Sequence, residues 1–81
     1  MNEDELKETN FQIAHHEDLI AGCENTIAKF ESKLKTAPPD EVDGIRSFLH
    51  NQKNMLDGFQ RDLDKWKIAK ADDVFPSHRL G

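Results

Sequence analysis

The fold is decided by residues 29–49, which read KFESKLKTAPPDEVDGIRSFL. The adjacent prolines Pro38 and Pro39 interrupt a helix-favouring sequence, because proline lacks the backbone N–H and restricts the residue before it to extended conformations. Proline also fits the first turn of a helix, so a second helix can begin here. We therefore expect one helix to end and another to begin at a turn formed by residues 37–40.

On both sides of this turn, apolar residues recur every seven positions, with a second set three residues further on. This is the spacing of a coiled-coil seam. Before the turn the two sets are Leu6, Ile13, Ile20, Ile27, Leu34 and Thr9, His16, Cys23, Phe30, Ala37. After it they are Val42, Leu49, Leu56, Leu63, Lys70 and Ile45, Gln52, Phe59, Trp66, Asp73.

These seams predict an all-α fold, with two long helices over residues 2–36 and 39–72. The short turn makes them antiparallel, so residues 1–72 form a single coiled-coil helical hairpin, and residues 73–81 form a tail. Such hairpins can pair into a helical bundle. The same seams would also suit a swapped dimer in which the turn opens into a continuous helix.

The helix ends carry capping residues. Asn2 and Glu5 have the spacing of a capping box at the first helix. Asp40 or Pro38 is expected to cap the second helix, with Asp43 completing a box from Asp40. In the tail, the alternatives for Val74 and Phe75 are that they fold back on Phe11 and Ile68 or that this cluster forms a second contact patch.

One flank of the seam is charged, acidic on the first helix and basic on the second. In the expected register Glu31 meets Arg46 and Glu24 meets Lys53. These pairs are expected to fix the alignment of the two helices rather than to add stability. Two polar residues inside the seam, His16 and Gln52, are also expected to act on register or oligomeric state. The register-setting residues are therefore His16, Gln52, Glu24, Lys53, Glu31 and Arg46.

The opposite flank is half apolar and runs beside the three internal glycines, Gly22, Gly44 and Gly58. Each glycine costs a helix about 1 kcal/mol relative to alanine, so three in phase suggest a surface that another backbone approaches closely. The competing explanation is that long helices tolerate glycine and curve there. The predicted interaction face consists of Leu19, Gly22, Thr26, Phe48, Met55 and Gly58.

The composition narrows the functional classes. The 81 residues carry a formal charge of -5, with acids and bases interspersed, which disfavours binding to nucleic acid. A monomer of this size buries little apolar surface, so we expect a homo-oligomer, a dimer or larger. The acidic start, Met1 to Glu8, differs from a signal peptide, and no apolar run reaches membrane-spanning length. We expect a soluble cytoplasmic protein.

The residues that commonly carry chemistry form no recognisable pattern. None of the four histidines pairs with another at the four-residue spacing that zinc sites on helices favour. Cys23 is the single cysteine and lies in the apolar seam. A glycine-rich phosphate loop and a Ser, His and Asp grouping are both absent from the sequence. We therefore expect no enzyme activity, no metal and no cofactor.

Three functions follow as hypotheses. The first is a non-enzymatic interaction protein that inhibits, adapts or regulates a partner protein; short free-standing chains of this kind often belong to phages or plasmids. The second is an oligomer that binds a small anion, such as a signalling nucleotide, between hairpins, and resembles phage-encoded cyclic-nucleotide sponges in coarse architecture only. The third is an RNA-binding dimer, similar in length and topology to plasmid copy-number regulators. Candidate anion contacts are Lys29, Lys33, Arg61, Lys65 and Arg79.

Overall fold

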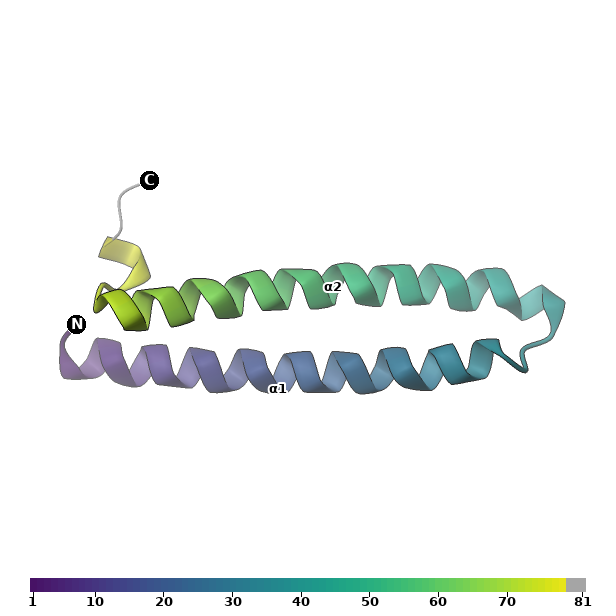
Figure 1. Cartoon of the computed structure of the whole chain (residues 1–81), viewed down its shortest axis with the longest axis horizontal. Helices are drawn as coiled ribbons and strands as arrows, with labels where there is room; N and C mark the ends of the chain where they lie inside the picture. Colours follow the sequence, from purple (N-terminus) through teal and green to yellow (C-terminus); the bar gives the residue numbers. More distant parts are fainter. Residues whose placement is uncertain (79–81) are drawn as a thin grey trace.

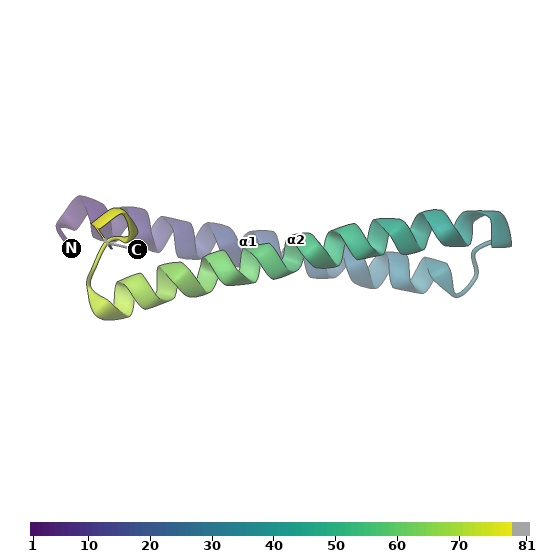
Figure 2. The ribbon, with the colours of Figure 1, turned by 90° about the horizontal axis from the view of Figure 1, so that it is seen from above.

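The computed structural model describes residues 1–78. The chain forms two long α-helices, α1 (Glu3–Leu34) and α2 (Pro39–Asp72), followed by the short 3-10 helix η1 (Pro76–His78). α1 and α2 lie side by side in opposite directions and form a rod of 55 × 23 × 15 Å (Figure 1). Figure 2 shows that the two helices cross at a shallow angle. The prediction of an all-helical hairpin with two packed helices is confirmed.

α1 begins with the capping box that the sequence predicts. The side chain of Asn2 accepts a hydrogen bond of 2.8 Å from the Glu5 backbone N–H, and the Glu5 carboxylate accepts one of 3.0 Å from the Asn2 N–H. Asn2 is thus the cap, and the helix starts one residue later than expected. Glu3 and Asp4 place further negative charge at the positive end of the helix dipole.

The connection between the helices begins earlier than predicted, because α1 ends two residues sooner. α1 ends at Leu34, because the N–H groups of Lys35 and Thr36 bond to carbonyl oxygens only three residues back, a tighter turn than the α-helix allows. The chain then passes through residues 35–38, and α2 begins at Pro39 as expected. Of the two expected caps for α2, Pro38 occupies the position and Asp40 does not, and Pro38 makes no capping hydrogen bond through its side chain.

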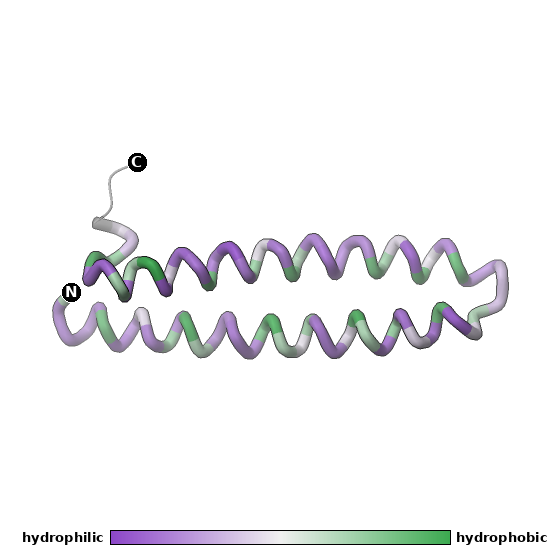
Figure 3. Tube along the Cα trace, in the orientation of Figure 1, coloured by the Kyte–Doolittle hydropathy of each residue, from purple (hydrophilic) through white to green (hydrophobic). Residues whose placement is uncertain are grey.

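The core follows the two predicted seams. Its centre is the cluster of Cys23, Ile27 and Leu49, and further seam residues pack around it. Figure 3 shows apolar residues recurring along both helices, mainly on the sides that face each other. The seam weakens at the open end of the rod, where Leu6 is 41% exposed and both Lys70 and Asp73 face solvent.

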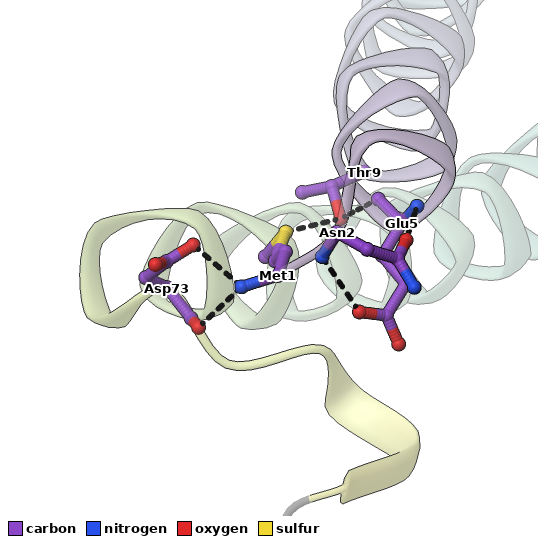
Figure 4. A network of polar contacts seen from close by, with 5 residues as sticks. All are labelled: Met1, Asn2, Glu5, Thr9 and Asp73. Atoms are coloured by element: carbon purple, nitrogen blue, oxygen red, sulfur yellow. Dashed lines mark hydrogen bonds and ion pairs between the residues drawn. The ribbon is translucent and has the colours of Figure 1, made fainter.

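The open end is closed by contacts that the sequence pattern does not predict (Figure 4). The amino group of Met1 donates hydrogen bonds to the side chain and the carbonyl oxygen of Asp73, at 2.9 and 3.1 Å. The Met1 side chain is almost fully buried, and its sulfur lies 3.4 Å from the hydroxyl of Thr9, which donates to the Glu5 carbonyl. We call Met1, Thr9 and Asp73 the amino-terminal clasp.

The beginning of the tail folds back on α2. The rings of Phe75 and Trp66 meet edge to face at 5.7 Å, and η1 lies beside the end of α2 (Figure 1). The suggested partners Phe11 and Ile68 remain 60% and 52% exposed. Phe75 therefore packs on an aromatic residue of the seam. The tail is not a simple loop, since η1 forms one turn of helix at Pro76.

Within residues 1–78, neither helix has an apolar stretch long enough to cross a membrane.

Candidate functional site

The candidate site is a surface shared by the middle of both helices. Leu19, Gly22 and Thr26 are spaced by three and four residues, so they lie on one side of α1. Phe48, Met55 and Gly58 are spaced by seven and three residues and share one side of α2. We call these six residues the glycine face.

Two cross-helix contacts place both halves of the glycine face on the same flank of the hairpin. The Phe30 and Phe48 rings lie 4.4 Å apart, and the His16 side chain lies 3.9 Å from that of Asp62. Phe48 and Asp62 share the heptad position of Met55, while Phe30 and His16 are seam residues of α1 that neighbour the position of Leu19. The glycine face is therefore one continuous surface.

The apolar side chains of this face differ in their exposure. Phe48 is half-buried because it packs on Phe30, whereas Met55 is 49% exposed. Thr26 donates its hydroxyl to the Gly22 carbonyl at 3.0 Å, so its polar atom is satisfied within α1. A partner could thus cover Thr26 without leaving an unpaired donor.

The glycines are not required by the packing of the hairpin itself. A Cβ atom added at Gly22, Gly44 or Gly58 would meet nothing within 4 Å. Each glycine weakens its helix by about 1 kcal/mol relative to alanine, and no intramolecular contact offsets this cost. Gly22 and Gly58 therefore leave two gaps in the side-chain surface, beside Leu19 and Met55.

The two polar residues of the seam lie inside the helix–helix contact. Cys23 donates through its thiol to the Gln52 carbonyl at 3.2 Å and lies 3.5 Å from the Gln52 side-chain oxygen, so these two residues meet across the helix–helix contact. His16 is 12% exposed, with one ring nitrogen 2.7 Å from the Gln12 carbonyl and the other facing Asp62. Their effect on register stays a prediction.

The charged flank lacks the expected ion pairs. Among residues 1–78, the carboxylate of Glu31 lies more than 4.0 Å from the charged nitrogens of Arg46. The same holds for the carboxylate of Glu24 and the amino group of Lys53. Glu31, Arg46 and Lys53 instead line one open groove near the turn, so the residues are neighbours whose charged groups remain apart. Long exposed side chains lose conformational entropy when they pair, and water screens the attraction.

The candidate anion contacts do not converge. Arg61 is paired with Asp57 at 3.0 Å, and the Lys33 amino group lies 4.8 Å from the centre of the Phe30 ring. Lys29 and Lys65 are exposed on different helices, and Arg79 lies outside the described residues. In the described part of the chain, no three His, Cys, Asp or Glu side chains are grouped to hold a metal ion.

In comparisons with known proteins, no protein-family model, curated protein or solved structure matches this chain.

Proposed function

We propose that this hairpin is a non-enzymatic interaction protein that binds a partner protein through the glycine face. Its two helices pack as a coiled coil, and the face they leave open receives a partner helix. The protein acts by occupying a surface of that partner, as an inhibitor, adaptor or regulator.

The observation that carries this proposal is the combination of Met55, 49% exposed, with open space at Gly22 and Gly58. Apolar side chains on a helix surface interlock with a partner when they enter gaps between its side chains. Glycine widens such gaps, because another backbone can then approach closely. The glycine face offers both projecting apolar side chains and gaps, which is the surface that helix packing needs.

The chemistry of the face also suits a protein partner. The hydroxyl of Thr26 is already bonded to Gly22, so burial of this residue leaves no unsatisfied donor. Phe48 is held in place by Phe30, so the face is partly ordered before a partner arrives. A preordered surface loses less conformational entropy on binding.

The experiment compares affinity purification from the source cells with native protein and with the double variant Leu19→Glu, Met55→Glu. Charged residues at the centre of an apolar contact oppose its burial, so a protein held by the native chain should be lost from the variant. A cross-linking group placed at position 58 should then form a covalent bond to the protein that the native chain retains.

The matched control is Phe11→Glu, Ile68→Glu, which removes two apolar side chains outside the face that are more exposed than Leu19 and Met55. This variant should retain the partner. Circular dichroism checks that both variants remain helical. Equal retention of the partner by the face variant and the native chain would show that the glycine face is not the binding surface.

A further inference from the structure

The hairpin exposes more surface than a compact protein of its mass. Its accessible area is 5865 Å² for 9.3 kDa, whereas the usual scaling of surface with mass gives about 5000 Å². The excess of roughly 900 Å² is close to the area that each partner contributes to a stable interface of standard size. If one long face were buried, the accessible surface area of the chain would fall to that of a globular protein of the same mass.

Two contacts between α1 and α2 show which residues of the glycine face lie side by side along the rod. His16 lies 3.9 Å from Asp62, and Cys23 lies 3.2 Å from the Gln52 carbonyl. Leu19 and Gly22 of α1 lie between these two levels. On α2 the same interval contains Met55 and Gly58.

Within this interval each large side chain stands across from a gap. Leu19 is three residues beyond His16 and Gly58 is four residues before Asp62, so Leu19 and Gly58 lie at nearly the same height. Gly22 is one residue before Cys23, and Met55 is three residues beyond Gln52. Gly22 and Met55 therefore also lie at nearly the same height along the rod. The centre of the face thus has two projections and two gaps in alternation.

We propose that the partner bound at the glycine face is a second copy of this chain, with Leu19 and Met55 of each copy entering the glycine gaps of the other. This inference rests on the proposed function and names its partner. A surface that carries both projections and gaps is complementary to itself, which is the condition for a symmetric contact between identical chains. The product is a four-helix bundle with Gly22 and Gly58 at its centre.

The distribution of charge supports a second copy. The whole chain carries a net charge of -5, which would oppose self-association if the acids were evenly spread. At the heptad positions of the glycine face, however, the charged residues are mixed in sign: they include the basic Lys29, Lys33 and Lys65 and the acidic Glu8, Asp62 and Asp72. The acidic residues Glu17, Glu24 and Glu31 lie on the opposite flank of α1. Two copies meeting at the glycine face therefore keep their main acidic rows apart.

The test measures mass by sedimentation equilibrium over a concentration series, for the native chain and for the double variant Gly22→Gln, Gly58→Gln. The native chain should approach twice 9.3 kDa. Glutamine fills the gaps with a long side chain, so the variant should stay at 9.3 kDa over the range where the native chain is paired. Its dissociation constant should rise by at least about tenfold.

This variant separates association from folding. Each added side chain points into open space within the hairpin, and glutamine favours helix more than glycine does, so the variant should fold at least as well as the native chain. The control is Gly44→Gln, which changes the third glycine, outside the interval that contains Leu19 and Met55. It should pair like the native chain.

A native chain that stays monomeric throughout would overturn the second-copy proposal, and so would association that survives in the double variant. Neither result decides the proposed function, because binding of a different protein is measured separately with Leu19→Glu, Met55→Glu. Loss of the cellular partner in that variant from a monomeric hairpin would leave the glycine face as a binding surface for another protein.

Discussion

At the scale of single residues, the most buried side chain is a polar one. Thr9 is fully buried, and its hydroxyl is satisfied by the Glu5 carbonyl one turn earlier in α1. Ala69 is 1% exposed near the same end of the rod. Small side chains at these positions let α1 and α2 approach closely where the regular apolar seam weakens.

Replacement of Thr9 by leucine should therefore destabilise the hairpin. The larger side chain has no space at a fully buried position, and overpacking costs about 1–3 kcal/mol. Urea denaturation followed by circular dichroism measures the free energy of unfolding. Thr9→Val, which keeps the shape, should remain within about 1 kcal/mol of the native chain. Equal stability of Thr9→Leu and Thr9→Val would contradict the close packing at this end.

Asp73 is the one residue other than glycine with a positive φ among those described, at 56°. This left-handed conformation ends α2 and is unfavourable for a residue with a Cβ atom. Asp73→Gly and Asp73→Ala both remove the ion pair with Met1, so the difference between them isolates the backbone. Asp73→Ala should be less stable by about 1 kcal/mol in thermal unfolding. Identical unfolding curves for the two variants would contradict a left-handed backbone conformation at position 73.

At the scale of helices, the local signals in the sequence predict the structure well. The capping box of Asn2 and Glu5 forms because both hydrogen bonds lie within one turn, where few alternatives compete. The heptad pattern predicts the buried faces, since burial of Ile27, Leu49 and Leu63 follows from their spacing alone. The end of α1 is less predictable, because the last turn tightens before Pro38.

Longer-range polar contacts are harder to predict. The expected pairing of Glu24 with Lys53 depends on flexible exposed side chains whose attraction barely exceeds their loss of entropy. The amino-terminal clasp depends on how Met1 folds back, which no spacing rule encodes. Of the glycine face, the sequence predicts the residues, but only the structure shows that Gly22 and Gly58 have open space around them.

The absent ion pairs lead to a prediction about the charged flank. Glu24→Gln and Lys53→Gln should each change the free energy of unfolding by less than about 0.5 kcal/mol, because no pair within 4.0 Å is lost. The double variant should equal the sum of the two single variants. A coupling energy above about 1 kcal/mol in this double-mutant cycle would show that the two charges interact in solution.

At the scale of the whole molecule, the connection at residues 35–38 determines the shape. It returns α2 along α1 and gives a rod 55 Å long. A swapped dimer with the turn opened would instead contain a continuous helix over residues 3–72, roughly 105 Å long at 1.5 Å per residue. Pro38 and Pro39 oppose that continuous helix.

Small-angle X-ray scattering should therefore give a maximum dimension close to 55 Å for the native chain. The proposed pairing at the glycine face would leave this length nearly unchanged, because the two rods would lie side by side. Pro38→Ala, Pro39→Ala should increase the population of the longer form, since alanine permits the helix to continue. A native maximum dimension near 105 Å would indicate the opened turn.

The amino-terminal clasp also has a mechanical consequence. Met1 and Asp73 hold the two helices together at the end of the rod opposite the turn (Figure 4). Tension applied through this end would load the clasp first and then peel α2 from α1, breaking the contacts between the helices one row after another. Sequential peeling needs less force than sliding two helices past each other along their length. A hairpin pulled from this end would therefore unzip, with the cluster of Cys23, Ile27 and Leu49 as its main point of resistance.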